Sequence, residues 1–263
     1  MYLADFHTHS QISFDSTAPL DDMALAAVGE GLAELCVTDH CDLLDEYGLN
    51  VYEFDWYGAL AQYRASVPVY AHCLKLKLGL ELGMGHIDPE TSRKILDVPE
   101  LDFVIGSIHN LSPQAGGSDF FYRDHSKAST CYDTLDNYFA SMAELAVTDF
   151  YDVLGHIIYP LRYMTAPVSL ERYWEQIDAI FRAAAERGRG IELNTYRGQT
   201  IAEWRPVLEH WKACGGELVT LGSDAHTPDG VGGGFREACD LLRAVGFSYL
   251  TTYEKRRPEL HRL

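Results

Sequence analysis

The chain has 263 residues, of which 47% are hydrophobic, and a formal net charge of -18 at pH 7. This size suffices for one large α/β domain with a sizeable core, and the acidic balance argues against a nucleic-acid surface, because phosphate binding relies on clustered Lys and Arg. No stretch has the roughly 20 apolar residues of a membrane span, and no basic and apolar leader opens the chain, so we expect a cytoplasmic protein that binds neither nucleic acid nor membrane.

Short β-rich runs alternate with amphipathic helical patterns along the whole chain. The runs span residues 3–9, 32–40, 74–83, 101–109, 150–157, 190–195, 218–226 and 247–253. The helical patterns span residues 20–32, 53–65, 132–146, 169–188, 200–215 and 235–246. This alternation predicts a parallel sheet, and seven or eight such units fit a closed barrel better than two sheets. We therefore predict a single domain over residues 1–263.

Local signals mark some element ends. Thr200 and Glu203 have the spacing of a capping box at a helix start, and Gly188 and Gly215 stand where C-terminal caps are expected. The irregular stretch 110–130 is longer than an ordinary connection. Two interpretations of it stay open, a lid or binding loop and a mobile surface insertion.

Two histidines stand one residue apart in the first run. Successive side chains of a strand point to opposite faces, so His7 and His9 share one face. Later runs also end in residues that bind metals, namely Asp39, His40, Glu81, His109, His156, Glu192, Asn194, Asp224 and His226. The carboxyl ends of parallel barrel strands meet on one face of the barrel. The sequence therefore predicts a ring of metal ligands on that face.

The other histidines lie in predicted helices, in loops or in the tail. We expect four of them to face solvent, namely His72, His86, His210 and His261. His125 lies in the irregular stretch 110–130, where it is either a substrate contact or an ordinary surface residue.

Six sequence features then occur in a characteristic order. They are HTHS at 7–10, a histidine that ends the second run, GLELG at 79–83, GSIHN at 106–110, GHI at 155–157 and GSDAH at 222–226. In this order they resemble the motifs of the polymerase and histidinol phosphatase (PHP) superfamily, from residue 5 to about residue 234. The resemblance implies a distorted, TIM-barrel-like (β/α)7 barrel with a trinuclear metal centre at the carboxyl ends of the strands.

The resemblance also implies a set of ligands. Carried over by motif, they are His7, His9 and Asp224 on a first metal, Glu81 bridging the first and second, His109 and His156 on the second, and Asp15, His40 and His226 on the third. Asp15 lies in the weak motif ISFDS, where a turn or capping aspartate is the alternative. Glu192 and Asn194 fall outside this set, and we expect them to orient ligands or to contact substrate.

The chemistry of these residue types points to phosphate ester hydrolysis. Nitrogen and carboxylate ligands suit Zn, Fe or Mn and select none of them. Two metals bridged by a carboxylate can deprotonate a bridging water near neutral pH, which predicts in-line attack of that hydroxide on phosphorus. Asp224 or His226 is the candidate acid for the leaving group. Arg162 and Arg197 are candidate phosphate ligands, because a guanidinium group suits phosphate oxygens.

Histidinol phosphatases of the superfamily are similar in placing arginines after these two motifs. This favours a metal-dependent phosphomonoester hydrolase acting on L-histidinol phosphate in histidine biosynthesis. The alternatives are a PHP phosphoesterase for another small phosphate, such as a nucleotide bisphosphate, and a non-catalytic PHP module that binds metal or a protein. A dinuclear amidohydrolase is disfavoured, because such enzymes generally need a mid-chain lysine and no strand end after Lys77 offers one. Metal identity and oligomeric state stay open.

Overall fold

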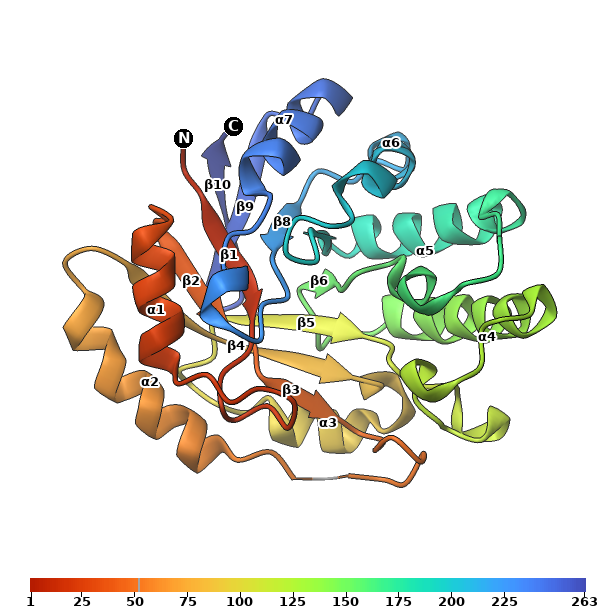
Figure 1. The fold of residues 1–263 in the computed structure, drawn as a ribbon, viewed down its shortest axis with the longest axis horizontal. Coiled ribbons are helices and arrows are strands. Elements are labelled where there is room, and N and C mark those ends of the chain that lie inside the picture. The colour runs from red at the N-terminus through yellow and green to blue at the C-terminus, as the bar shows by residue number, and fades with distance from the viewer. Residues whose placement is uncertain (52) are drawn as a thin grey trace.

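The computed structural model describes residues 1–51 and 53–263. The barrel strands are β1 (Ala4–Thr8), β2 (Glu34–Val37), β3 (His40–Asp42), β4 (Lys75–Gly83), β5 (Phe103–Ser107), β6 (Val153–Leu154), β7 (Gly190–Asn194) and β8 (Val219–Gly222). They are parallel and run in the order β1-β2-β4-β5-β6-β7-β8, while β3 also pairs with β4. The predicted barrel is confirmed as a nearly closed barrel of seven parallel strands surrounded by helices (Figure 1).

One barrel position is filled by two short strands. The predicted run 32–40 breaks after Val37 and resumes at His40 as β3. Val37 pairs with Leu78 and His40 pairs with Glu81, so β2 and β3 follow each other along β4. At the break, the carboxylate of Asp39 accepts hydrogen bonds from the backbone and hydroxyl of Ser10, at 2.6 and 2.8 Å. The interruption therefore ties this strand to the loop that follows β1.

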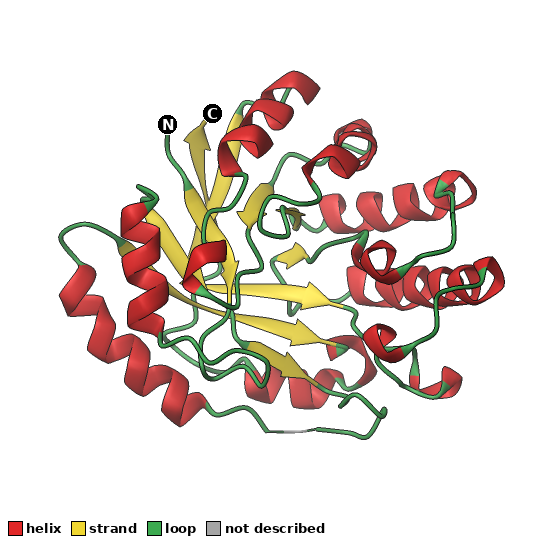
Figure 2. Ribbon diagram, viewed as in Figure 1, coloured by secondary structure: helices red, strands yellow, loops and turns green. Residues whose placement is uncertain are grey.

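Helices cover the outside of the sheet (Figure 2). They are α1 (Leu20–Gly29), α2 (Trp56–Tyr70), α3 (Pro89–Ile95), α4 (Ala128–Ala146), α5 (Trp174–Glu186), α6 (Trp204–Ala213) and α7 (Phe235–Val245). In α7 the buried residues are Phe235, Ala238, Cys239 and Leu242, the spacing of a helix with one apolar face. The short helix α3 was not among the predicted patterns. Within the described residues, no helix has both the length and the apolar character needed to cross a membrane.

The barrel closes between its first strand and the segment after its last strand. The backbone N–H of Asp224 donates to the carbonyl of His7 at 2.9 Å, and that of His9 donates to Ala225 at 2.9 Å. The carboxylate of Asp5 accepts hydrogen bonds from the backbone N–H groups of Ser223 and Gly232, each at 3.0 Å. The two ends of the motif series, far apart in sequence, are thereby held side by side.

The last predicted run, 247–253, does not join the barrel. It forms an antiparallel hairpin of β9 (Tyr249–Glu254) and β10 (Arg257–Arg262). Tyr253 packs in a cluster with Phe6 and Phe103, and its ring centre is 5.0 Å from that of Phe103. Because Phe103 opens β5, the hairpin covers the amino-terminal end of the barrel, opposite to the strand ends where ligands were predicted.

The predicted helix ends have mixed outcomes. Gly188 and Gly215 follow α5 and α6 with φ of 66° and 85°, the left-handed conformation expected of C-terminal glycines. The prediction of a capping box at Thr200 is wrong. A 3-10 turn, η6 (Ile201–Glu203), starts there, and the Thr200 hydroxyl donates to the carbonyl of Asn194 at 3.1 Å instead of capping the turn.

The stretch 110–130 is packed against its neighbours over its first half. The side-chain amide of Asn110 donates to the carbonyls of Asp45 and Gly117, both at 2.8 Å. Gly117, with φ of 68°, touches Gly48 so closely that a Cβ on it would lie 2.8 Å from the Gly48 Cα. Two short 3-10 turns follow, η2 (Pro113–Ala115) and η3 (Phe120–Tyr122). These contacts fasten the first half of the stretch to the loop that contains Asp45 and Gly48.

The contact between Gly117 and Gly48 can be tested with a matched pair of variants. Gly188 has a similar φ of 66°, but a Cβ there meets nothing within 4 Å. Gly188→Ala should lower the free energy of unfolding by about 1 to 2 kcal/mol through backbone strain. Gly117→Ala should lower it by about 1 to 3 kcal/mol more, because backbone atoms must separate. Urea unfolding measures both, and equal losses would contradict the close packing of this loop.

Candidate metal centre

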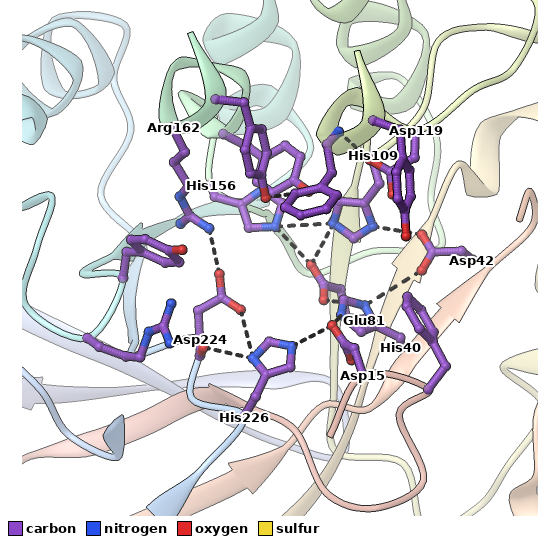
Figure 3. Close-up of a pocket in the computed structure, with 17 residues that line it drawn as sticks. Asp15, His40, Asp42, Glu81, His109, Asp119, His156, Arg162, Asp224 and His226 are labelled. Carbon is purple, nitrogen blue, oxygen red and sulfur yellow. Dashed lines mark hydrogen bonds and ion pairs between the residues drawn. The ribbon is translucent and has the colours of Figure 1, made fainter. Parts of the chain in front are cut away.

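A pocket opens at the carboxyl ends of the strands (Figure 3). Its lining includes most of the ligands expected from the sequence, namely Asp15, His40, Glu81, His109, His156, Asp224 and His226. His7 and His9 are fully buried and contact this lining from beneath. The structure thus brings together, in three clusters, side chains from the first and last motifs and from every motif between them.

The first cluster contains two histidine nitrogens and two carboxylate oxygens. The Nε2 atoms of His7 and His9 are 3.1 Å apart. They lie 3.2 and 3.6 Å from Oε2 of Glu81, and 3.6 and 3.5 Å from Oδ1 of Asp224. Four ligand-type atoms on four different side chains therefore face one point.

The second cluster shares Glu81 with the first. The other carboxylate oxygen, Oε1, lies 3.2 Å from Nε2 of His109 and 2.9 Å from Nε2 of His156. The two histidine nitrogens are 3.4 Å apart. Glu81 has no exposed surface, so its two oxygens link two adjacent sites inside the protein.

The third cluster lies nearer to solvent. Oδ2 of Asp15 is 2.9 Å from Nε2 of His226 and 3.6 Å from Nε2 of His40. The side chain of Asp15 is 38% exposed, whereas those of the first two clusters are almost completely buried. His40 also turns its Nδ1 toward Oε2 of Glu81, at 2.9 Å. A cation in this cluster would therefore be the most accessible of the three.

These separations fit the binding of divalent metal ions. Ligands 2.0 to 2.1 Å from a tetrahedral zinc ion lie roughly 3.3 Å from one another. The distances within the first cluster are 3.1 to 3.6 Å. The Nδ1–H groups of His7 and His109 donate to Glu192 and Asp42 at 2.6 and 2.7 Å, which directs both Nε2 atoms into the clusters. In the neutral imidazole form, each Nε2 atom can offer its lone pair to a metal ion there.

Comparison with known proteins identifies the family. The PHP domain family matches residues 5–196. The chain belongs to the PHP family. A probable histidinol-phosphatase from Clostridium acetobutylicum is 30% identical over 246 residues, which cover 90% of this chain and 91% of the relative. The histidinol-phosphatase of Lactococcus lactis is 25% identical over 95% of this chain and 93% of its own length. Within the PHP family the chain therefore groups with the histidinol-phosphatases, as the motifs indicated.

The fold agrees with this assignment. The crystal structure of the histidinol phosphate phosphatase from Lactococcus lactis, complexed with zinc, L-histidinol and phosphate, matches with a TM-score of 0.84. The match covers 98% of both chains at 24% sequence identity. At this identity the likeness establishes the shared PHP barrel.

Glu192 and Asn194 form a layer behind the first cluster. Oε1 of Glu192 accepts from His7 Nδ1 at 2.6 Å, and Oε2 accepts from the backbone N–H of His156 at 2.8 Å. The amide of Asn194 donates to Glu192 and to Asp224, at 3.0 and 3.2 Å. Asn194 is fully buried, so the substrate contact considered for it is corrected. Both residues orient the histidines and the carboxylate instead.

Arg162 is engaged in the same layer. One of its guanidinium nitrogens donates to Oδ2 of Asp224 at 2.7 Å and the other to Oδ1 of Asn194 at 2.6 Å. Burial alone raises the pKa of Asp224, but His7, His9 and Arg162 outweigh it and hold that pKa well below its usual range. Asp224 is therefore a poor proton donor. One oxygen of its carboxylate accepts from the guanidinium group, and the other oxygen faces the two histidines.

Arg197 is the more available of the two arginines. It follows β7, lines the pocket, and its guanidinium carbon lies 4.4 Å above the ring centre of Tyr196. Its backbone N–H donates to the carbonyl of Ser223 at 2.9 Å, which fixes the start of the side chain beside Asp224. Within the described residues, no carboxylate forms an ion pair with Arg197. The N–H groups of this guanidinium are therefore available to an anion in the pocket.

Some residues of the site were missed in the sequence. Asp42 accepts a hydrogen bond from His109. The sequence signal that could have identified Asp42 was its position two residues after His40, on the same face of the strand. The hydroxyl of Ser107 donates to Glu81 at 2.7 Å. Further pocket residues are Phe14, Asp119, Phe121, Tyr122, Tyr159, Tyr163 and Tyr196. Most of these lie in irregular segments, where no periodic pattern marks them.

The histidines outside the ring of predicted metal ligands are in part more buried than the sequence predicts. His125 is buried and does not line the pocket. Its Nε2 atom forms a hydrogen bond with the Thr134 hydroxyl at 3.2 Å. The side chain of His86 is only 3% exposed, and burial lowers its pKa to about 4, so its expected solvent exposure is wrong. His210 and His261 are partly covered by stacking on Trp174 and Tyr2. His72 is exposed, as predicted.

The role of Glu192 leads to a prediction about metal affinity. In Glu192→Gln, one of the two acceptor oxygens becomes an amide donor facing the N–H groups of His7 or His156. Zinc or manganese should bind roughly 10- to 100-fold more weakly, the usual effect of losing such an orienting partner. Competition with a chromophoric chelator measures the affinity, and Glu217→Gln, at an exposed position, is the control. Unchanged affinity in Glu192→Gln would show that Glu192 only supports the fold.

Proposed function

We propose that this PHP-family chain hydrolyses L-histidinol phosphate to L-histidinol and phosphate, as a phosphoric monoester hydrolase of histidine biosynthesis. The observation that carries the proposal is Glu81, whose two oxygens join two clusters of histidines at the floor of a pocket that also presents Arg197. The full-length similarity to histidinol-phosphatases supports the substrate. We further infer a cytoplasmic enzyme whose partner is a small phosphate ester.

The proposed ligands are the three clusters described above. His7, His9 and Asp224 would hold one ion, Glu81 would bridge it to a second held by His109 and His156, and Asp15, His40 and His226 would hold a third. We propose two or three ions of Zn, Fe or Mn, since the donor set does not select among them. When bound, such ions acidify a water molecule and neutralise phosphoryl charge.

The residues of the chain supply orientation and proton transfer. Water attacks phosphorus, the bond from phosphorus to the ester oxygen breaks, and a proton must reach the departing alcohol oxygen. Asp224 is unsuited to donate that proton, because both its oxygens are already engaged. His226, at the accessible side of the pocket, is our candidate for this role in the two-ion state, because an ion on its Nε2 would leave no proton there to donate. Arg197 binds the phosphate, and the N–H groups of Arg162 not used by Asp224 and Asn194 assist it.

A steady-state comparison of substrates tests the function. With Mn or Zn present, kcat/KM for L-histidinol phosphate should exceed that for a panel of sugar phosphates, nucleotide phosphates and nucleotide bisphosphates. Chelation of the metal should abolish turnover, and metal addition should restore it. A higher kcat/KM for a nucleotide bisphosphate would point to a different PHP phosphoesterase. No turnover of any phosphomonoester by metal-loaded protein would point to a non-catalytic module.

Arg197→Ala tests phosphate binding. A guanidinium fork donates two directed, charge-assisted hydrogen bonds to phosphate oxygens, and alanine removes them. The loss of a preorganised donor costs roughly 2 to 4 kcal/mol of transition-state stabilisation, or about 30- to 1,000-fold in kcat/KM. Metal content should stay unchanged, because Arg197 contacts none of the proposed ligands through its side chain in the described structure. Arg236→Ala, exposed and outside this pocket, is the control. Near-normal kcat/KM in Arg197→Ala would exclude the role.

A further inference from the structure

One carboxylate of the pocket is not used by the metal clusters. Of the acidic side chains in the lining, Asp15, Asp42, Glu81 and Asp224 have histidine nitrogens at 2.9, 2.7, 2.9 and 3.5 Å, respectively. Asp119 also lines the pocket, but within the described residues it forms no ion pair. In Figure 3, it is drawn on the side of the pocket that carries His109 and Asp42, away from Asp224.

Several contacts fix the position of Asp119 beside the three clusters of proposed metal ligands. Its backbone N–H donates to the carbonyl of Glu46 at 3.3 Å, and the next residue, Phe120, donates from its N–H to the carbonyl of His109 at 3.0 Å. Phe120 is fully buried, which anchors this turn in the core. Oδ1 of Asp119 accepts from the backbone N–H of Phe121 at 2.7 Å. The second oxygen has no protein donor among the described residues, so it is available to a ligand.

The surroundings of Asp119 are aromatic. Phe14, Phe121 and Tyr122 line the same pocket although they are 80%, 59% and 67% exposed. Tyr163 also lines the pocket, with its ring centre 5.5 Å from that of Phe121. Burial raises the pKa of Asp119, as expected for a carboxylate partly removed from water. Exposed aromatic faces gathered at a pocket mouth are typical of a site for an apolar or aromatic ligand group.

We propose that Asp119 binds the ammonium group of the substrate and that the aromatic mouth receives its ring, an inference that rests on the proposed function. L-Histidinol phosphate is an anion at one end and a cation at the other. Its phosphate is assigned to the metal clusters and Arg197, so its ammonium group, on the carbon next to the ester methylene, must lie close to them. An ammonium group only donates and a carboxylate only accepts, so the free oxygen of Asp119 complements it.

The aromatic residues complete the match to this substrate. An imidazole with a pKa near 6.5 is largely neutral above neutral pH, so it has less need of a carboxylate than the ammonium group does. Its flat ring suits the faces of Phe14, Phe121 and Tyr122. Asp119 is thus a specificity residue, which selects amino-alcohol phosphates over neutral or anionic phosphate esters.

The first test measures selectivity in Asp119→Asn. Asparagine keeps an oxygen to accept from Phe121, so the loop should stay in place. Selectivity is the ratio of kcat/KM for L-histidinol phosphate to that for the analogue that has hydrogen in place of the ammonium group. This ratio should fall about 10- to 100-fold, because an uncharged amide replaces the carboxylate. Asp124→Asn is the matched control, since Asp124 lies on the same loop, is exposed and does not line the pocket.

A second measurement separates binding from proton donation. If Asp119 binds the ammonium group, Asp119→Asn should weaken inhibition by L-histidinol about 10- to 100-fold while inhibition by inorganic phosphate stays within about twofold. If Asp119 instead protonates the leaving group, inhibition by L-histidinol will not change, and the proposal is overturned. A wild-type enzyme that hydrolyses other phosphate esters but not L-histidinol phosphate would overturn the proposed function and this inference together. Loss of selectivity in Asp124→Asn as well would overturn the inference alone.

Discussion

The site depends on the burial of one carboxylate, Glu81, at the centre of the barrel. A carboxylate without exposed surface is strongly unfavourable unless charges and hydrogen bonds compensate for the loss of water. Here His7, His40, His109 and His156 surround it at 2.9 to 3.2 Å, and Ser107 donates to it. These residues come from β1, β3, β5 and the segments that follow β5 and β6, so the barrel must bring all of them to the strand that carries Glu81.

A second layer of acceptors then decides what the histidines can do. Glu192 and Asp42 each bind the inner nitrogen of a histidine, which points the outer nitrogen into the cluster. Arg162 and Asn194 hold one oxygen of Asp224 in the same way and leave the other for the histidines. His7, His109 and Asp224 therefore each have one side fixed by protein and one side free for a cation. This arrangement explains how a chain with a net charge of -18 can receive a phosphate.

The pocket has two chemically different ends, and different parts of the fold build them. The charged floor is made by strand ends, which the barrel holds rigidly. The aromatic mouth is made by the loop after β1 and by the stretch 110–122, which glycine contacts and the hydrogen bond from Phe120 to His109 fasten to the barrel. The first end suits the phosphate common to all phosphomonoesters, and the second suits the part in which substrates differ. The two ends of the pocket are therefore built by separate parts of the chain.

The sequence by itself determined the barrel and the ring of histidines and carboxylates, because strand periodicity and the parallel order of the strands are local and repetitive signals. Only the tertiary structure decided that 32–40 divides into β2 and β3, that 247–253 covers the other end of the barrel, and that Thr200 bonds to Asn194 instead of capping a turn. It also decided that Asn194 is sealed from the pocket while Asp119 faces into it. Each of these outcomes depends on which groups from distant segments meet, and the side-chain pattern of one segment contains no information about its partner's position.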